Sequence, residues 1–150
     1  MKQLSKKIYV GTVDDYREAD NSFAFLCCAK HPVFVELGGQ GLYKQRGKTL
    51  ALNMIDVVDP SYFHLEQFEK ALAFIKENEK VLVFCNQGRS RSPVIAMLGL
   101  IQEGVIKADN LGQAYREMKK LYPRLQANMV IIKFVGSHYD SILAPLLYTK

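Results

Sequence analysis

The fold is decided by residues 80–102, which read KVLVFCNQGRSRSPVIAMLGLIQ. The first five of these residues form a β-branched and aromatic run that is typical of a buried strand, and the run ends abruptly at Cys85. A turn that contains Gly88 follows, and an almost wholly apolar run over residues 94–102 then predicts a helix. Pro93 suits the first position of that helix, because its missing N–H is one that the helix would leave unpaired. A strand that passes through a glycine turn into a helix indicates an α/β fold.

Segments on both sides of this stretch repeat the alternation of strands and helices. Strands are predicted over residues 7–11, 23–29 and 49–55, and the glycine-rich residues 36–48 read as a loop or hairpin. Further helices are predicted for residues 61–78, for a segment that Asp109 caps and that extends to residue 121, and for a segment from about residue 128 toward residue 142. We therefore expect an α/β fold with a central, mostly parallel sheet flanked by helices, in which ligands bind beyond the carboxyl ends of the strands.

The composition bounds the class of protein. A chain of 150 residues, 49% hydrophobic and 23% charged, suits one compact domain over residues 1–150 and excludes disordered and low-complexity classes. A net charge of +5 favours anionic partners. The longest apolar run, residues 94–101, is too short to span a bilayer. Three cysteines without framework spacing argue against a disulfide scaffold, so we expect an intracellular, cytoplasmic protein.

The turn after Cys85 has the residue types that phosphate chemistry needs. Gly88 supplies a position where positive φ costs little, so the backbone N–H groups of residues 86–91 can point inward at the N-terminus of the helix. That positive field favours an anion and makes the Cys85 thiol a ready nucleophile. Arg91 offers a planar fork for two phosphate oxygens, and Ser92 can donate a hydrogen bond to the sulfur. These parts together predict attack on the phosphorus of a phosphate ester.

The same residues carry a family resemblance. The segment from Cys85 to Arg91, followed by Ser92, resembles the signature of the cysteine-dependent protein tyrosine phosphatase superfamily, and its Ser-Arg-Ser-Pro ending is similar to that of the dual-specificity branch. Residues 8–12 resemble the opening strand and turn of that family, and residues 115–123 resemble its penultimate helix. The resemblance covers most of the chain and implies a dual-specificity phosphatase-like fold.

The resemblance also implies a mechanism. Cys85 would attack the phosphate and form a cysteinyl-phosphate intermediate, whose departure Ser92 would assist. The phosphate would be bound by the Arg91 side chain and by the loop residues Asn86, Gln87, Gly88, Arg89, Ser90 and Arg91. An aspartate from a loop some thirty residues earlier would be the general acid. We prefer Asp56, because it directly follows the strand over residues 49–55, and keep Asp59 as the alternative.

One position departs from the family pattern. The family usually has histidine directly before the cysteine, where this chain has Phe84. That histidine helps to order the loop and to tune the thiol. The cysteine nucleophile, the phosphate-binding loop and the arginine are all retained. We therefore expect an active enzyme, and any effect of Phe84 would be a slower reaction.

The leading hypothesis is hydrolysis of phosphotyrosine, extending to phosphoserine and phosphothreonine, with a phosphorylated protein as partner. One alternative is a phosphatase of a phosphoinositide or of an RNA 5′-phosphate end, although only Arg89 is basic between Cys85 and Arg91. The other is a phosphate-binding pseudophosphatase, which Phe84 suggests. The oligomeric state stays open.

We expect no metal, no cofactor and no nucleic-acid partner. The three histidines, His31, His64 and His138, show no ligand spacing. Basic residues at near-helical spacing after residue 115 favour a solvated helix face, namely Arg116, Lys119, Lys120 and Arg124. The adjacent Cys27 and Cys28 lie in an apolar run and are interpreted as core residues.

Overall fold

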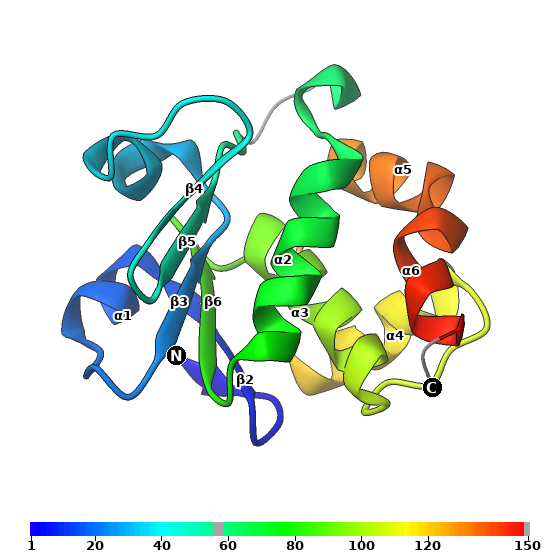
Figure 1. Cartoon of the computed structure of the whole chain (residues 1–150). Coiled ribbons are helices and arrows are strands. Elements are labelled where there is room, and N and C mark those ends of the chain that lie inside the picture. The colour runs from blue at the N-terminus through cyan, green and yellow to red at the C-terminus, as the bar shows by residue number, and fades with distance from the viewer. Residues whose placement is uncertain (56–58, 149–150) are drawn as a thin grey trace.

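A six-stranded sheet forms the centre of the protein, with the strand order β1-β2-β6-β3-β5-β4 (Figure 1). The computed structural model describes residues 1–55 and 59–148. The strands are β1 (Lys2–Gln3), β2 (Ile8–Thr12), β3 (Ala24–Cys27), β4 (Tyr43–Arg46), β5 (Thr49–Leu52) and β6 (Val81–Cys85). The four inner strands pair in parallel, and the edge strands β1 and β4 pair antiparallel with β2 and β5. This confirms the predicted α/β fold with a mostly parallel central sheet, and the glycine-rich segment before β5 is a hairpin.

Helices cover both faces of the sheet (Figure 1). On one face lie α1 (Val13–Glu18) and a short helical turn, Lys30–Phe34. On the other face lie a 3-10 turn (Pro60–Tyr62) and the helices α2 (Leu65–Glu77), α3 (Arg91–Glu103), α4 (Leu111–Leu121), α5 (Met129–Ser137) and α6 (Tyr139–Tyr148). Helices α2 and α3 pack directly on the strands, and α4, α5 and α6 pack on these two helices. Within the part of the chain that is described, no helix is both long and apolar enough to cross a membrane.

The start of α3 differs from the sequence prediction. The helix begins at Arg91, so Pro93 occupies its third position and not its first. Proline is tolerated there because the first four N–H groups of a helix have no acceptor within the helix. The helix therefore begins directly after the loop, and Arg91 and Ser92 belong to its first turn.

The later helices also differ from their predicted limits. The N-cap of α4 is Asn110 and not Asp109, because the Asn110 side chain reaches the N–H of Gln113 at 2.9 Å. Residues 128–142 were predicted as one helix, but α5 ends at its C-cap His138 and α6 begins directly after it.

The centre of the sheet is packed on both faces. All five residues of β6 are buried, as are the first ten residues of α3. On the opposite face, the Phe84 ring stacks on that of Tyr16 in α1, with centroids 4.6 Å apart. Helix α1, which the sequence prediction missed, starts with a capping box formed by Thr12 and Asp15. Phe84 is thus a packing residue that holds the end of β6 against α1.

Candidate active site

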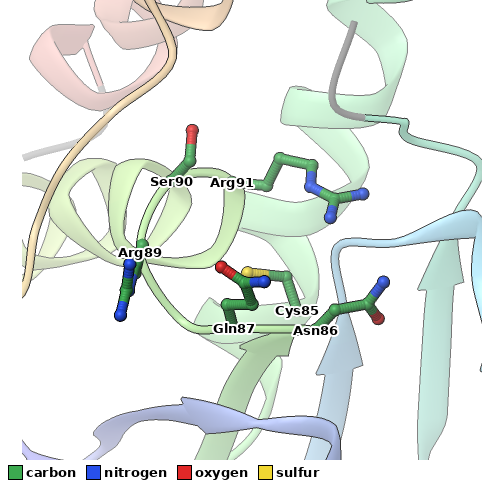
Figure 2. A pocket seen from close by; sticks show the side chains of 6 residues that line it. All are labelled: Cys85, Asn86, Gln87, Arg89, Ser90 and Arg91. Atoms are coloured by element: carbon green, nitrogen blue, oxygen red, sulfur yellow. The ribbon is translucent and has the colours of Figure 1, made fainter.

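Cys85 lies at the floor of a small polar pocket (Figure 2). It is the last residue of β6, which lies between β2 and β3, so it ends at the middle of the carboxyl edge of the sheet. The pocket has a cavity volume of about 160 Å³ and is lined by Cys85, Asn86, Gln87, Arg89, Ser90 and Arg91. The Sγ atom of Cys85 lies 3.1 Å from the Oγ atom of Ser92, which is fully buried beneath it. Six of the residues that the sequence singled out line this pocket, and Ser92 contacts the sulfur of Cys85.

The bend of the loop requires a glycine. Gly88 has φ +67°, a left-handed conformation that costs other residues energy. A β-carbon at this position would also lie 3.0 Å from the Gly11 carbonyl oxygen and 3.2 Å from the Tyr122 hydroxyl. The positive φ confirms the conformation that the sequence predicts for Gly88, and the close contacts leave no room for a side chain there.

In the Arg91 guanidinium group, the Nη1 atom has a hydrogen-bond acceptor, whereas the Nε atom has none among the described residues. Its Nη1 atom donates to the Met54 carbonyl oxygen at 3.0 Å, and the side chain is almost buried. Its Nε–H group is buried and has no acceptor among residues 1–55 and 59–148. A buried donor without a partner costs about 1–3 kcal/mol. An acceptor that reached this group would remove that penalty. In Figure 2 the guanidinium extends toward the side where Asn86 lies, whereas the Arg89 side chain points away from it.

Of the two candidate acids, Asp56 and Asp59, the structure describes only Asp59. Asp56 lies outside the described residues. Asp59 is exposed, and its carboxylate accepts the N–H of Ser61 at 2.9 Å. Hydrogen bonds from the Ser61 backbone and side chain hold the pKa of Asp59 below its usual range. Arg91 donates to the backbone oxygen of Met54, so its guanidinium contacts the residue two positions before the candidate acid Asp56 in the sequence.

The other two cysteines belong to the core, as the sequence predicted. Cys27, at the end of β3, donates its S–H to the Ala29 carbonyl oxygen at 3.3 Å, and burial raises its pKa to about 12. Burial also raises the pKa of Cys28, which is completely enclosed. Both thiols therefore stay protonated. Across the described residues, no group of three His, Cys, Asp or Glu side chains is placed to hold a metal ion.

Residues 122–128, between α4 and α5, support the outer side of the loop, a role that the sequence interpretation missed. Hydrogen bonds connect the two segments, among them the Tyr122 hydroxyl to the Gly88 oxygen (2.6 Å), Arg124 Nη2 to the Gln87 oxygen (3.3 Å), the Gln126 N–H to the Arg89 oxygen (2.7 Å) and the Asn128 N–H to the Ser90 Oγ (2.8 Å). Arg124 was predicted to lie on a solvated helix face, but α4 ends at Leu121 and Arg124 contacts the loop. Only the Asn-capped start of α5 could have been found from the sequence.

Comparison with solved structures identifies the fold. No protein-family model and no curated protein matches the sequence. The structure of DUSP15 has 16% identity and a TM-score of 0.69, over 100% of this chain and 96% of that one. The human tyrosine phosphatase-like serine/threonine/tyrosine-interacting protein also has 16% identity and a TM-score of 0.69, over 96% and 97%. PTPMT1 has 14% identity and a TM-score of 0.65, over 99% of both chains. The chain therefore has the dual-specificity phosphatase fold that the resemblance implied.

Proposed function

We propose that this protein hydrolyses phosphate monoesters through a cysteinyl-phosphate intermediate on Cys85. One observation carries the proposal. The Cys85 thiol and the Ser92 hydroxyl lie 3.1 Å apart at the floor of a pocket whose wall includes Arg91, and the buried Nε–H of Arg91 has no acceptor among the described residues. A nucleophile, a donor to that nucleophile and an unsatisfied cation at one pocket suit a tetrahedral oxyanion. The fold likeness supports the same conclusion.

In the first step the Cys85 thiolate attacks phosphorus, the S–P bond forms and the ester P–O bond breaks. The leaving oxygen takes a proton from the general acid. Charge on the phosphoryl oxygens is stabilised by the backbone N–H groups of residues 86–91 and by Arg91. Because Nη1 of Arg91 is occupied by the Met54 oxygen, the Nε and Nη2 groups are left to bind two phosphoryl oxygens.

In the second step water attacks the phosphorus and the S–P bond breaks. The carboxylate left by the first step accepts a proton from that water. The Cys85 sulfur leaves as a thiolate and accepts a hydrogen bond from the Ser92 hydroxyl, which is positioned for this at 3.1 Å. Inorganic phosphate and the free enzyme are the products.

We assign the general acid to Asp56 and not to Asp59. A general acid must hold a proton at the working pH, and the pKa of Asp59 is lowered by its hydrogen bonds to Ser61. Those bonds make Asp59 a turn residue. Asp56 follows the strand β5 more closely and precedes the turn.

We propose proteins phosphorylated on tyrosine, and on serine and threonine, as the substrates. The exposed Arg89 at the rim of the pocket favours substrates with additional negative charge beside the phosphate. We propose further that residues 1–150 form a single catalytic domain and that it works inside the cell, where Cys85 stays reduced; all three cysteines are free.

Phe84 favours a second candidate function, phosphate binding without turnover. Its side chain has no hydrogen-bonding group, so it orders the end of β6 through packing, which includes its stacking on Tyr16. A pocket that binds phosphate but lacks the tuning of the thiol would be a binding module for phosphorylated proteins.

Hydrolysis of p-nitrophenyl phosphate separates the two functions. The wild type and Cys27→Ser should both hydrolyse p-nitrophenyl phosphate, and vanadate should inhibit them. Cys85→Ser should not hydrolyse it. Cys27→Ser is the matched control because it removes the thiol at the end of the neighbouring strand. No turnover in any of the three, with phosphopeptide binding retained, would establish the binding module instead.

The ratio of kcat/KM values among four substrate classes then tests the substrate proposal. Phosphotyrosine peptides should exceed phosphoserine and phosphothreonine peptides, and both should exceed a phosphoinositide and a 5′-phosphorylated RNA. A phosphoinositide or an RNA end as the best substrate would overturn the assignment to proteins while leaving the chemistry at Cys85 intact.

A further inference from the structure

We propose that Tyr122 is a positioning residue that fixes the orientation of the peptide between Gly88 and Arg89 in the phosphate-binding loop. Tyr122 is the C-cap residue of α4 and lies 34 residues away from Gly88 in the sequence. Its hydroxyl donates to the Gly88 carbonyl oxygen at 2.6 Å, and both residues are buried. The inference rests on the function proposed above, because it concerns how the same loop binds an oxyanion.

The orientation of a peptide group decides whether its N–H can reach the ligand. In a trans peptide the carbonyl and the N–H point in opposite directions. A Gly88 oxygen held on the outer side of the loop therefore directs the N–H of Arg89 toward the other side, where the pocket lies. Glycine has low barriers to positive and negative φ, so this peptide is the one in the loop that needs an outside constraint most. Gly88 adopts φ +67° and depends on its surroundings to stay there.

The neighbouring carbonyl groups are held from the same side. The oxygens of Gln87 and Arg89 accept hydrogen bonds from Arg124 at 3.3 Å and from the Gln126 backbone at 2.7 Å. Three consecutive loop carbonyls thus face one segment of the chain. Of the three donors, the Gln126 N–H belongs to the backbone, and Arg124 is exposed and makes the longest bond. Tyr122 supplies the short, buried side-chain bond of the set.

The phenol of Tyr122 remains a donor under working conditions. Burial is the largest influence on this group and raises the pKa of Tyr122 above its ordinary value. The hydroxyl therefore keeps its proton through the neutral and mildly alkaline range, and the Gly88 oxygen keeps its partner. The space between Gly88 and the Tyr122 hydroxyl is closely packed, because a β-carbon on Gly88 would lie 3.2 Å from that hydroxyl.

Tyr122→Phe removes the hydroxyl and keeps the ring, so the packing of this buried side chain is preserved. One hydrogen bond to a neutral group corresponds to about a tenfold change in an equilibrium constant. We expect the inhibition constant of vanadate to rise about tenfold and kcat to fall by a similar factor. The rate at which uncharged iodoacetamide alkylates Cys85 should fall much less than vanadate binding does, because a single reoriented N–H is only part of the positive field that favours the thiolate. The melting temperature should stay within a few degrees of the wild type.

Tyr115→Phe is the matched control. Tyr115 is also on α4, and its hydroxyl accepts the Ala127 N–H at 3.4 Å, at the other side of the same supporting segment. The Tyr115→Phe substitution should leave the inhibition constant of vanadate and kcat unchanged. Equal losses in both variants, or a Tyr122→Phe protein with wild-type vanadate inhibition, would overturn the positioning role. So would a parallel loss of iodoacetamide reactivity, since that would indicate general damage to the site.

Vanadate binding, measured by calorimetry, keeps this test separate from the proposed hydrolysis. A wild type that binds vanadate without turnover refutes the enzyme, while the comparison of Tyr122→Phe with Tyr115→Phe still decides the role of Tyr122. A wild type that binds no vanadate would refute both proposals.

Discussion

Ser92→Ala should slow the second chemical step and leave the first step intact. In the structure the Ser92 Oγ lies 3.1 Å from the Cys85 Sγ, and the two side chains are 0% and 3% exposed. Water cannot replace this hydroxyl at a site so enclosed. A hydrogen bond to a charged group contributes about 1.5–3 kcal/mol. Since about 1.4 kcal/mol corresponds to a factor of ten, loss of the bond should slow departure of the thiolate by about 10- to 140-fold.

The two steps respond differently because charge moves in opposite directions in them. During attack the sulfur gives up negative charge, so loss of a donor to the sulfur does not raise that barrier. During hydrolysis of the intermediate the sulfur regains the negative charge. Loss of the Ser92 hydroxyl therefore raises the barrier of this step by the full energy of the hydrogen bond. The phosphorylated enzyme should therefore accumulate.

Rapid-mixing kinetics with p-nitrophenyl phosphate detects that accumulation. Ser92→Ala should release a burst of p-nitrophenol close to one equivalent per enzyme, followed by a slow steady state, as is typical of a trapped covalent intermediate. Ser92→Thr retains a hydroxyl and should suppress the burst. The reasoning is refuted if Ser92→Ala shows no burst and a wild-type steady rate, or if its rate loss depends strongly on the leaving group, which would place the effect in the first step.

Three further substitutions test the acid and the arginine. Asp56→Asn should reduce kcat about 10²-fold or more with phenyl phosphate and much less with p-nitrophenyl phosphate, because only the poorer leaving group needs the proton. Asp59→Asn should retain kcat with both substrates, and the opposite ranking would reverse the assignment. Arg91→Lys keeps the charge but loses the Nε–H and the planar fork that Met54 holds, so kcat/KM should fall about 10²–10³-fold and vanadate inhibition should weaken. A variant that kept vanadate inhibition at the wild-type level would contradict the role of the fork.

The strand, loop and helix around Cys85 could be predicted because residues close together in the sequence determine them. A buried strand, a glycine that tolerates φ +67° and an apolar helix follow one another within residues 80–102. Each is recognised from neighbouring residues alone. The first residue of this helix was predicted wrongly: the sequence places Pro93 there, but the helix starts at Arg91, because a helix tolerates proline anywhere in its first turn.

The role of Phe84 could not be predicted from its neighbours. The sequence shows only that a histidine is missing before Cys85. The structure shows that the ring stacks on Tyr16, from a helix of six residues that is too short for a periodic pattern to reveal. Its contact depends on how α1 folds back on the sheet.

The strand–loop–helix unit and the chemistry of its side chains, a thiol, an arginine and a serine at fixed offsets, follow from local sequence. The contacts that hold this unit in place come from distant parts of the chain. The Met54 carbonyl that holds Arg91 is 37 residues away, and Tyr122 and Asn128 contact the loop from 34 and 38 residues away. Periodicity and turn preferences act over a few residues, whereas these contacts form only when separate helices and strands pack, so no local pattern encodes them.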